Sequence, residues 1–159
     1  MTGEAKKSFL RNDVVQLMNA FAQDAKSNWG KMNIQQMVEH VTDFFKVSFE
    51  HITFDLVTPE EHLPKYKEFL MSDKEFRENT KAPESVLGAD PVGARSSSLK
   101  EALEELQKSI NSFFEYFQKD PLLTTTHPVF GPLNFEEWVL LHYKHVIHHL
   151  KQFGSAVTY

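Results

Sequence analysis

The sequence predicts an all-α protein, a four-helix bundle, on three observations. Four stretches carry apolar residues at the three- and four-residue spacing of an amphipathic helix. Three of these stretches follow a side chain that commonly caps helices, namely Asn33, Ser98 and Asn134. No segment alternates apolar and polar residues over the length of an ordinary strand. At 159 residues the chain is most simply one domain, 1–159, because that length suffices for a full core.

The first two helices are expected in the N-terminal third. Residues 1–10 are polar and are expected to be flexible, and the first helix is expected over residues 13–25. Asn33 and Gln36 stand three residues apart, which is the spacing of a capping box at a helix start. The second helix is expected to continue from there to residues 54–57, where a proline follows.

The last two helices are the longest predicted segments. Ser98 is expected to cap a helix over residues 99–119, which an Asp-Pro pair ends. Asn134 and Glu137 form a second capping box, and the fourth helix is expected over residues 134–153, with a glycine after it.

Two connections separate these helices. Residues 58–98 contain most of the prolines, several glycines and a serine run, and one short helix is expected there over residues 60–71. A connection of this length inside one domain is often functional or mobile. Residues 122–133 form the second connection, for which no strand is expected.

Composition excludes several classes of function. The formal net charge is -5 and no Lys/Arg cluster offers a phosphate-binding face, so nucleic acid is not an expected partner. The absence of cysteine excludes disulfides, Cys-based zinc sites and thiol nucleophiles, so any thiol must arrive as a co-substrate. No run approaches the roughly 20 apolar residues of a membrane span. The polar N-terminus does not resemble a signal peptide, and a cytoplasmic protein is expected.

Half of the eight histidines lie on the fourth predicted helix. His145 and His149 are one helical turn apart, so two imidazoles can reach the same metal ion. His142 lies a further turn back on nearly the same face, whereas His148 projects from a different face and is expected outside the site.

A third ligand must come from a facing helix, because metal sites in bundles combine helices. His40 alone among the other histidines falls in the middle of a predicted helix. His40, His145 and His149 would leave open positions for water or substrate, which is typical of catalytic metal sites. Imidazole ligands suit zinc, nickel, copper and iron alike.

Alternative roles remain for these and the other polar residues. A histidine pair one turn apart is common on helix surfaces, and an inward histidine more often makes a core hydrogen bond. Asp43 and His142 are second-choice participants, as a general base or as groups that support the ligands. His127 is expected as a loop anchor or as part of the pocket wall. His51 and His62 are expected at the surface.

Two motifs carry a resemblance to a known family. One is Trp29-Gly30-Lys31-Met32-Asn33 with Met37-Val38-Glu39-His40, and the other is His145-x-x-His148-His149-x-x-Gln152. They resemble the DinB/YfiT-like superfamily of metalloenzymes, whose signature reads His-x-x-His-His-Arg-Gly-Gln. The segment from His127 to Gly154 resembles a branch of it catalogued as a domain of unknown function. The resemblance covers roughly residues 8–155, and Leu150-Lys151 replaces the Arg-Gly of the signature.

The resemblance implies a four-helix bundle that is often a homodimer. It implies His40, His145 and His149 as ligands of one divalent ion (nickel, zinc or iron). Relatives of this type are transferases and isomerases that use a low-molecular-weight thiol such as mycothiol or bacillithiol, and some are hydrolases.

The residues and the resemblance together predict a metal-dependent enzyme that acts on a small molecule. Hydrolysis or transfer of a low-molecular-weight thiol is the expected reaction, with the metal as Lewis acid. The alternative is a non-catalytic bundle that holds a metal or small ligand or stabilises a dimer. A closed structural site would need a fourth ligand, for which His142 is the candidate.

Overall fold

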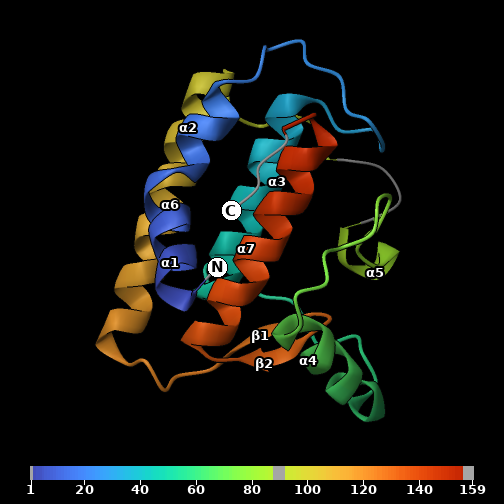
Figure 1. Cartoon of the computed structure of the whole chain (residues 1–159), viewed down its shortest axis with the longest axis vertical. Coiled ribbons are helices and arrows are strands. Elements are labelled where there is room, and N and C mark those ends of the chain that lie inside the picture. Colours follow the sequence, from blue (N-terminus) through green and yellow to red (C-terminus); the bar gives the residue numbers. More distant parts are fainter. Residues whose placement is uncertain (1, 88–91, 156–159) are drawn as a thin grey trace.

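Four helical segments pack side by side in a computed structural model that describes residues 2–87 and 92–155 (Figure 1). They are α1 (Gly3–Asn12) with its continuation α2 (Val14–Asn19), α3 (Ile34–Ser48), α6 (Leu99–Lys119) and α7 (Phe135–Gln152). Helix α3 packs against α6 and α7, and α1 packs against α7 and α6. The prediction of an all-α four-helix bundle is confirmed. Residues 88–91, part of the predicted connection, and both chain ends lie outside the described residues.

The first helix begins ten residues earlier than predicted. Thr2 caps α1 by accepting a hydrogen bond at Oγ1 from the Ala5 N–H, at 3.1 Å. Phe9 and Leu10 are buried in the core, and the Phe9 ring meets the edge of Tyr143 on α7. Residues 3–10, within the segment expected to be flexible, are therefore helical, and two apolar side chains hold this polar segment against the bundle.

The second helix ends earlier than predicted. Asn33 and Gln36 form the predicted capping box, but α3 stops at Ser48 instead of continuing to residues 54–57. Glu50 has a φ of 63°, in the left-handed region that commonly ends helices. The N–H groups of His51 and Ile52 then both donate to the carbonyl of Lys46, which closes the helix end.

Residues 58–87 of the long connection lie on the side of α7 away from α1 and α6 (Figure 1). It contains the predicted short helix, as a 3₁₀ turn η1 (Glu60–His62) followed by α4 (Leu63–Met71), and a four-residue helix α5 (Glu84–Leu87). Residues 72–83, here named the strap, follow α4. Lys144 of α7 holds the strap by donating from Nζ to the carbonyls of Ser72, at 2.7 Å, and of Lys74.

A small β-hairpin occupies the connection in which no strand was expected. Strands β1 (Thr125–His127) and β2 (Gly131–Leu133) pair antiparallel around a three-residue loop. Gly131 has a φ of +81°, the conformation that this loop length requires after its turn. Thr125 ties the hairpin to the bundle, since its hydroxyl accepts from Trp138 Nε1 and donates to the Ser48 carbonyl, both at 2.8 Å.

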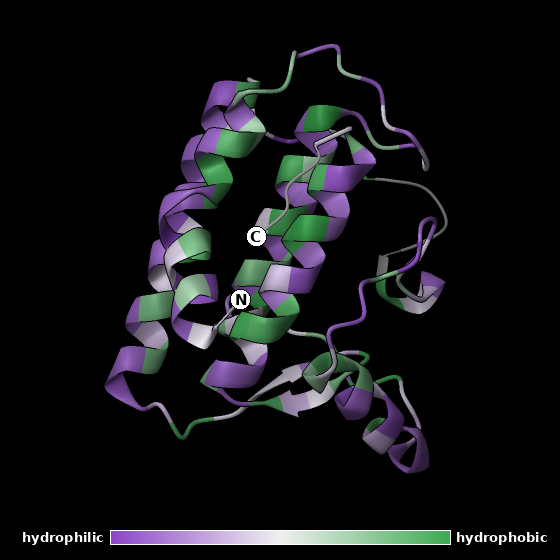
Figure 2. Cartoon of the chain, viewed as in Figure 1, coloured by the Kyte–Doolittle hydropathy of each residue, from purple (hydrophilic) through white to green (hydrophobic). Residues whose placement is uncertain are grey.

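Apolar faces of the helices turn toward the interior of the bundle (Figure 2). Aromatic rings fill much of this core, and Phe45, Phe113 and Phe117 are almost fully buried. Phe113 contacts both of the other two rings in edge-on arrangements. Within residues 2–87 and 92–155, none of the helices combines the length and apolar character needed to cross a membrane.

Candidate metal centre

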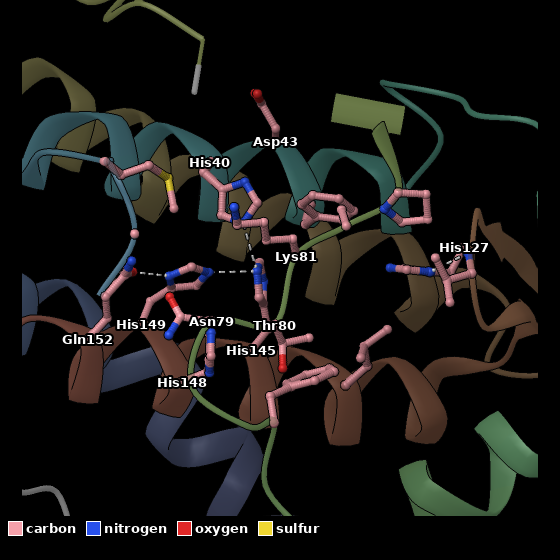
Figure 3. Close-up of a pocket in the computed structure, with 18 of the residues that line it drawn as sticks. His40, Asp43, Asn79, Thr80, Lys81, His127, His145, His148, His149 and Gln152 are labelled. Atoms are coloured by element: carbon pink, nitrogen blue, oxygen red, sulfur yellow. Dashed lines mark hydrogen bonds between the residues drawn. The ribbon is translucent and has the colours of Figure 1, made fainter. Parts of the chain in front are cut away.

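Three histidines from two helices converge at one point beside the core (Figure 3). His145 Nε2 lies 3.0 Å from His40 Nε2 of α3 and 3.0 Å from His149 Nε2 of its own helix. All three nitrogens lie within 4.8 Å of one another, and within the described residues this is the group that could hold a metal ion. The structure thus brings together the three residues that the sequence singled out.

Hydrogen bonds alone do not account for this convergence. In a neutral imidazole each ring nitrogen either carries one proton or offers one lone pair. His145 Nε2 faces two nitrogen neighbours at hydrogen-bond distance, but it can donate to or accept from only one of them in good geometry. Three lone pairs directed at a shared cation satisfy all three nitrogens, so the donor set fits a divalent transition metal.

Gln152 fixes the protonation of one candidate ligand. Its Oε1 lies 2.7 Å from His149 Nδ1, and its Nε2 donates to the Trp29 carbonyl at 2.9 Å. Because an amide oxygen can only accept, Nδ1 of His149 carries the proton and Nε2 offers its lone pair.

Gly30 makes room for this chain of hydrogen bonds. Its φ is +77°, and a Cβ at this position would stand 2.9 Å from Gln152 Nε2. Both the backbone conformation and the space therefore favour glycine beside the amide. The Trp29-Gly30 pair of the first motif thus supports the glutamine of the second.

Burial keeps the three histidines in the neutral form. Loss of solvent lowers the pKa of His40 to about 4, with a smaller contribution from His148. Burial likewise lowers the pKa of His145 and of His149 well below the ordinary value, and repulsion from the neighbouring histidines adds to it. Near neutral pH all three are neutral and can bind a metal without first losing a proton.

A pocket of about 1210 Å³ opens beside the three nitrogens. Its wall comes from both central helices, the hairpin and the strap, and includes His40, Phe44, Phe76, Lys81, His127, Phe130, His145, His148 and His149. Figure 3 shows Asn79, Thr80 and Lys81 of the strap beside the histidines. The site therefore adjoins a space large enough for a small organic molecule.

His148 lies in this pocket, which corrects its assignment to a face outside the site. It is 7% exposed and its ring contacts Trp29, Phe76 and His149. His148 does project from a different face of α7 than His145 and His149, as predicted. The Trp29 turn and the strap pack beside that face, however, and extend the pocket to it.

His142 is buried one turn before the candidate ligands and is not part of their cluster. Its ring stacks on Phe45, with centroids 3.9 Å apart and planes inclined by 16°, and on Trp138 at 5.2 Å. Burial, more than the neighbouring His127, lowers its pKa well below the ordinary value. Its Nε2 has no hydrogen-bond partner among the described residues. His142 therefore contributes a neutral polar atom to the pocket wall.

Asp43 lies at the rim of the pocket, and its side chain points away from the three histidines (Figure 3). Its Oδ2 accepts from Arg95 Nη2 at 2.8 Å. Glu39, which the sequence gave no role, is buried beside it and accepts from the Arg95 N–H at 2.7 Å and from Gln35 at 3.1 Å. The two carboxylates thus hold the segment that leads into α6.

His127 is both an anchor of its loop and part of the pocket wall, the two roles considered for it. Its Nδ1 accepts from the N–H groups of Val129 and Phe130, at 3.0 and 3.2 Å. His51 and His62 are exposed, as expected, although His62 borders the pocket. The sequence did not reveal the roles of Gln152 or of the strap. The signals available for Gln152 were its position on the histidine face and its place in the second motif.

Comparison with known protein families gives a match. The family model described as the DinB superfamily matches residues 10–153. No curated protein and no solved structure matches the chain significantly. The family match covers the end of α1, all of α2, α3, α6 and α7, both motifs and the three converging histidines. The chain therefore belongs to the DinB superfamily, as the two motifs indicated.

Proposed function

We propose that this chain is a metal-dependent enzyme, with His40, His145 and His149 as ligands of one divalent ion (zinc, nickel or iron). The observation that carries the proposal is the convergence of the Nε2 atoms of three neutral histidines at the wall of a pocket. Three protein ligands with space beside them are typical of catalytic metal sites.

The reaction we propose is hydrolysis or transfer of a low-molecular-weight thiol to a small electrophile. A bound divalent ion would supply a Lewis acid that lowers the pKa of a water or thiol toward neutrality. The chain supplies the surroundings. Gln152 orients His149, and the rings of Phe44, Phe76 and Phe130 give the pocket an apolar wall. With no cysteine in the chain, a reacting thiol must enter the pocket as a small molecule.

A non-catalytic bundle that holds a metal or ligand is the alternative. A purely structural site would be closed by a fourth protein ligand, and His142 was the candidate. Its ring is stacked between Phe45 and Trp138 and stays outside the group of converging nitrogens. The space beside the three histidines therefore favours an exchangeable position, which supports catalysis over a structural role.

Elemental analysis of protein purified without metal-affinity chromatography tests the centre. We expect close to one equivalent of zinc, nickel or iron per chain in the wild type and none in His145→Ala. His51→Ala is the matched control, because His51 is exposed, follows the end of α3 and does not line the pocket, so its loss should leave the metal content unchanged. Protein that contains no metal and takes up none on titration would refute the metal centre.

Activity assays then separate the enzyme from the binding module. The metal found is used to load the protein for screens of ester and amide hydrolysis and of thiol transfer to electrophiles. Turnover that is lost in His145→Ala and kept in His51→Ala supports an enzyme. Stoichiometric metal without turnover in either screen supports the non-catalytic alternative.

A further inference from the structure

His127 stands at the part of the pocket formed by the hairpin, and its ring is held from several sides. It is 8% exposed, stacks on Phe44 with centroids 5.5 Å apart, and meets Phe130 and Trp138 at 5.2 and 5.6 Å. A ring packed among three aromatic side chains has one orientation. Whatever His127 presents to the pocket is therefore fixed in place.

The hairpin also fixes which ring nitrogen carries the proton. Nδ1 accepts from two backbone N–H groups, those of Val129 and Phe130, so it must offer a lone pair. In the neutral ring the proton then resides on Nε2. Burial lowers the pKa of His127 to about 3, so the ring stays neutral across the physiological range. His127 is thus a permanent N–H donor at Nε2.

This donor points into the pocket. Figure 3 shows the ring with one nitrogen bonded back to the hairpin and the other directed toward the converging histidines. Among the described residues, Nε2 of His127 has no hydrogen-bond partner. Because this atom is open to the pocket and has no partner in the described part of the chain, an acceptor on a ligand can take the place that water would otherwise occupy.

Phe44 sets the distance between this donor and the candidate metal centre. Its ring lies 5.5 Å from the His127 ring and 5.4 Å from the His145 ring. The two histidines therefore flank one aromatic surface. A ligand that reaches both would lay an apolar body across Phe44, with a polar group at each end.

Charges around the pocket favour an acidic ligand. The acidic side chains in its wall are already paired, Glu39 and Asp43 with Arg95, and Glu75 with Lys151. In contrast, Lys65, Arg77 and Lys81 also line the pocket and form no ion pair within the described part of the chain. Lys65 belongs to α4, which packs on the hairpin through Tyr66 and Phe130. In a chain of net charge -5, these cations give the pocket a positive field.

We propose that His127 is a specificity-determining residue that binds a carboxylate of the substrate through Nε2–H, with the pocket cations supplying charge complementarity. The ligand class is a small organic acid with an apolar body between its carboxylate and its reacting end. The inference rests on the proposed function in taking this pocket as the substrate site. It does not require that a metal be bound.

The test compares two probes of equal length, hexanoate and 1-hexanol, on metal-free wild-type protein with ¹⁵N-labelled histidine. We expect Nε2-protonated His127 in the free protein and a change in its Nε2 signal when hexanoate binds. A charged acceptor typically strengthens a hydrogen bond by about 1 to 1.5 kcal/mol, which would make hexanoate about tenfold tighter than hexanol. If hexanoate does not contact His127, the Nε2 signal should stay unchanged, even when the packing around the ring is intact.

The variant that isolates the donor is His127→Asn. An asparagine side chain accepts from the backbone N–H two residues on, as His127 does from Val129, but it is too short to present a donor at the Nε2 position. We expect the variant to fold and to lose most of the preference for hexanoate, keeping only the part that the pocket cations provide. His51→Asn, at an exposed position that does not line the pocket, is the matched control and should keep the preference.

The outcomes separate this inference from the metal centre. Equal affinity of the wild type for the two probes, no binding of either, or an unchanged preference in His127→Asn would overturn the role of His127. A zinc titration of the same samples reports on the three converging histidines independently. Preference for hexanoate in a protein that binds no zinc would uphold the inference and refute the metal centre. Zinc binding without a preference for hexanoate would uphold the metal centre and refute the inference.

Discussion

Gln152→Leu is expected to weaken metal binding without removing a ligand. In the wild type, Gln152 accepts from His149 Nδ1–H and donates to the Trp29 carbonyl. Leucine has a similar size but can do neither. The His149 ring would lose the contact that fixes its proton on Nδ1, so its Nε2 lone pair would no longer be held toward the other two nitrogens.

Two quantities are expected to change, the metal affinity and the stability of the metal-free protein. Loss of such a supporting hydrogen bond typically reduces metal affinity about 10- to 100-fold, or about 1.4 to 2.7 kcal/mol. His149 is 5% exposed, so its orphaned Nδ1–H would also cost about 1 to 3 kcal/mol of stability in the metal-free protein. Water can reach the half-buried Trp29, so its carbonyl should add little to that loss.

Competition between the protein and a chromophoric chelator for zinc near neutral pH measures the affinity. Gln152→Glu is the informative companion, because its carboxylate still accepts from His149 Nδ1–H and should keep the affinity near that of the wild type. Gln107→Leu on α6, outside the pocket, controls for the loss of a glutamine. The reasoning is refuted if Gln152→Leu binds zinc as tightly as the wild type, or if Gln152→Glu loses as much affinity as Gln152→Leu.

Three further predictions use other parts of the site. Gly30→Ala should lower zinc affinity, as Gln152→Leu does, because the added Cβ would press on the Gln152 amide. It should also cost about 1 to 2 kcal/mol of stability, because the φ of this residue is +77°. Zinc competition measures the first effect and urea unfolding the second. Lys144→Met should leave zinc affinity unchanged but speed hydrogen exchange of the strap amides, since the bond to the Ser72 carbonyl is lost; equal exchange in both proteins would contradict this anchoring role. Metal-free protein should lose stability as the pH falls below about 6.5, because unfolded His127 binds a proton there whereas the folded residue, with a pKa of about 3, does not. In urea titrations His127→Asn should remove about 1.4 kcal/mol per pH unit of that slope between pH 6 and 4.

Much of the site could be predicted because helices have a fixed period. The four-residue spacing of His145 and His149 places them together on any straight helix, and His40 was the histidine left in the middle of another helix. The same period misplaced His148 outside the site. Helical angle says which way a side chain points, but it does not say how far neighbouring segments wrap around the helix.

Other features leave too weak a pattern in the sequence. The strands at Thr125–His127 and Gly131–Leu133 are three residues long, which is too short for alternation to be visible. The end of α3 depends on Glu50 taking a positive φ, a conformation that glutamate rarely adopts. The strap is held by a lysine that donates to backbone carbonyls, and such contacts depend on three-dimensional proximity alone.

Helix α7 combines functions that bundles often distribute over several helices. It carries two of the converging histidines, the glutamine that orients one of them, and the lysines that hold the strap at Ser72 and Glu75. One residue inserted or deleted in its middle would rotate the following turn by about 100° and disrupt all of these contacts together. Among relatives, we therefore expect the length of α7 to be invariant. Gains and losses of residues should concentrate between α4 and α6, where the pocket can be reshaped for a different substrate without disturbing the histidines.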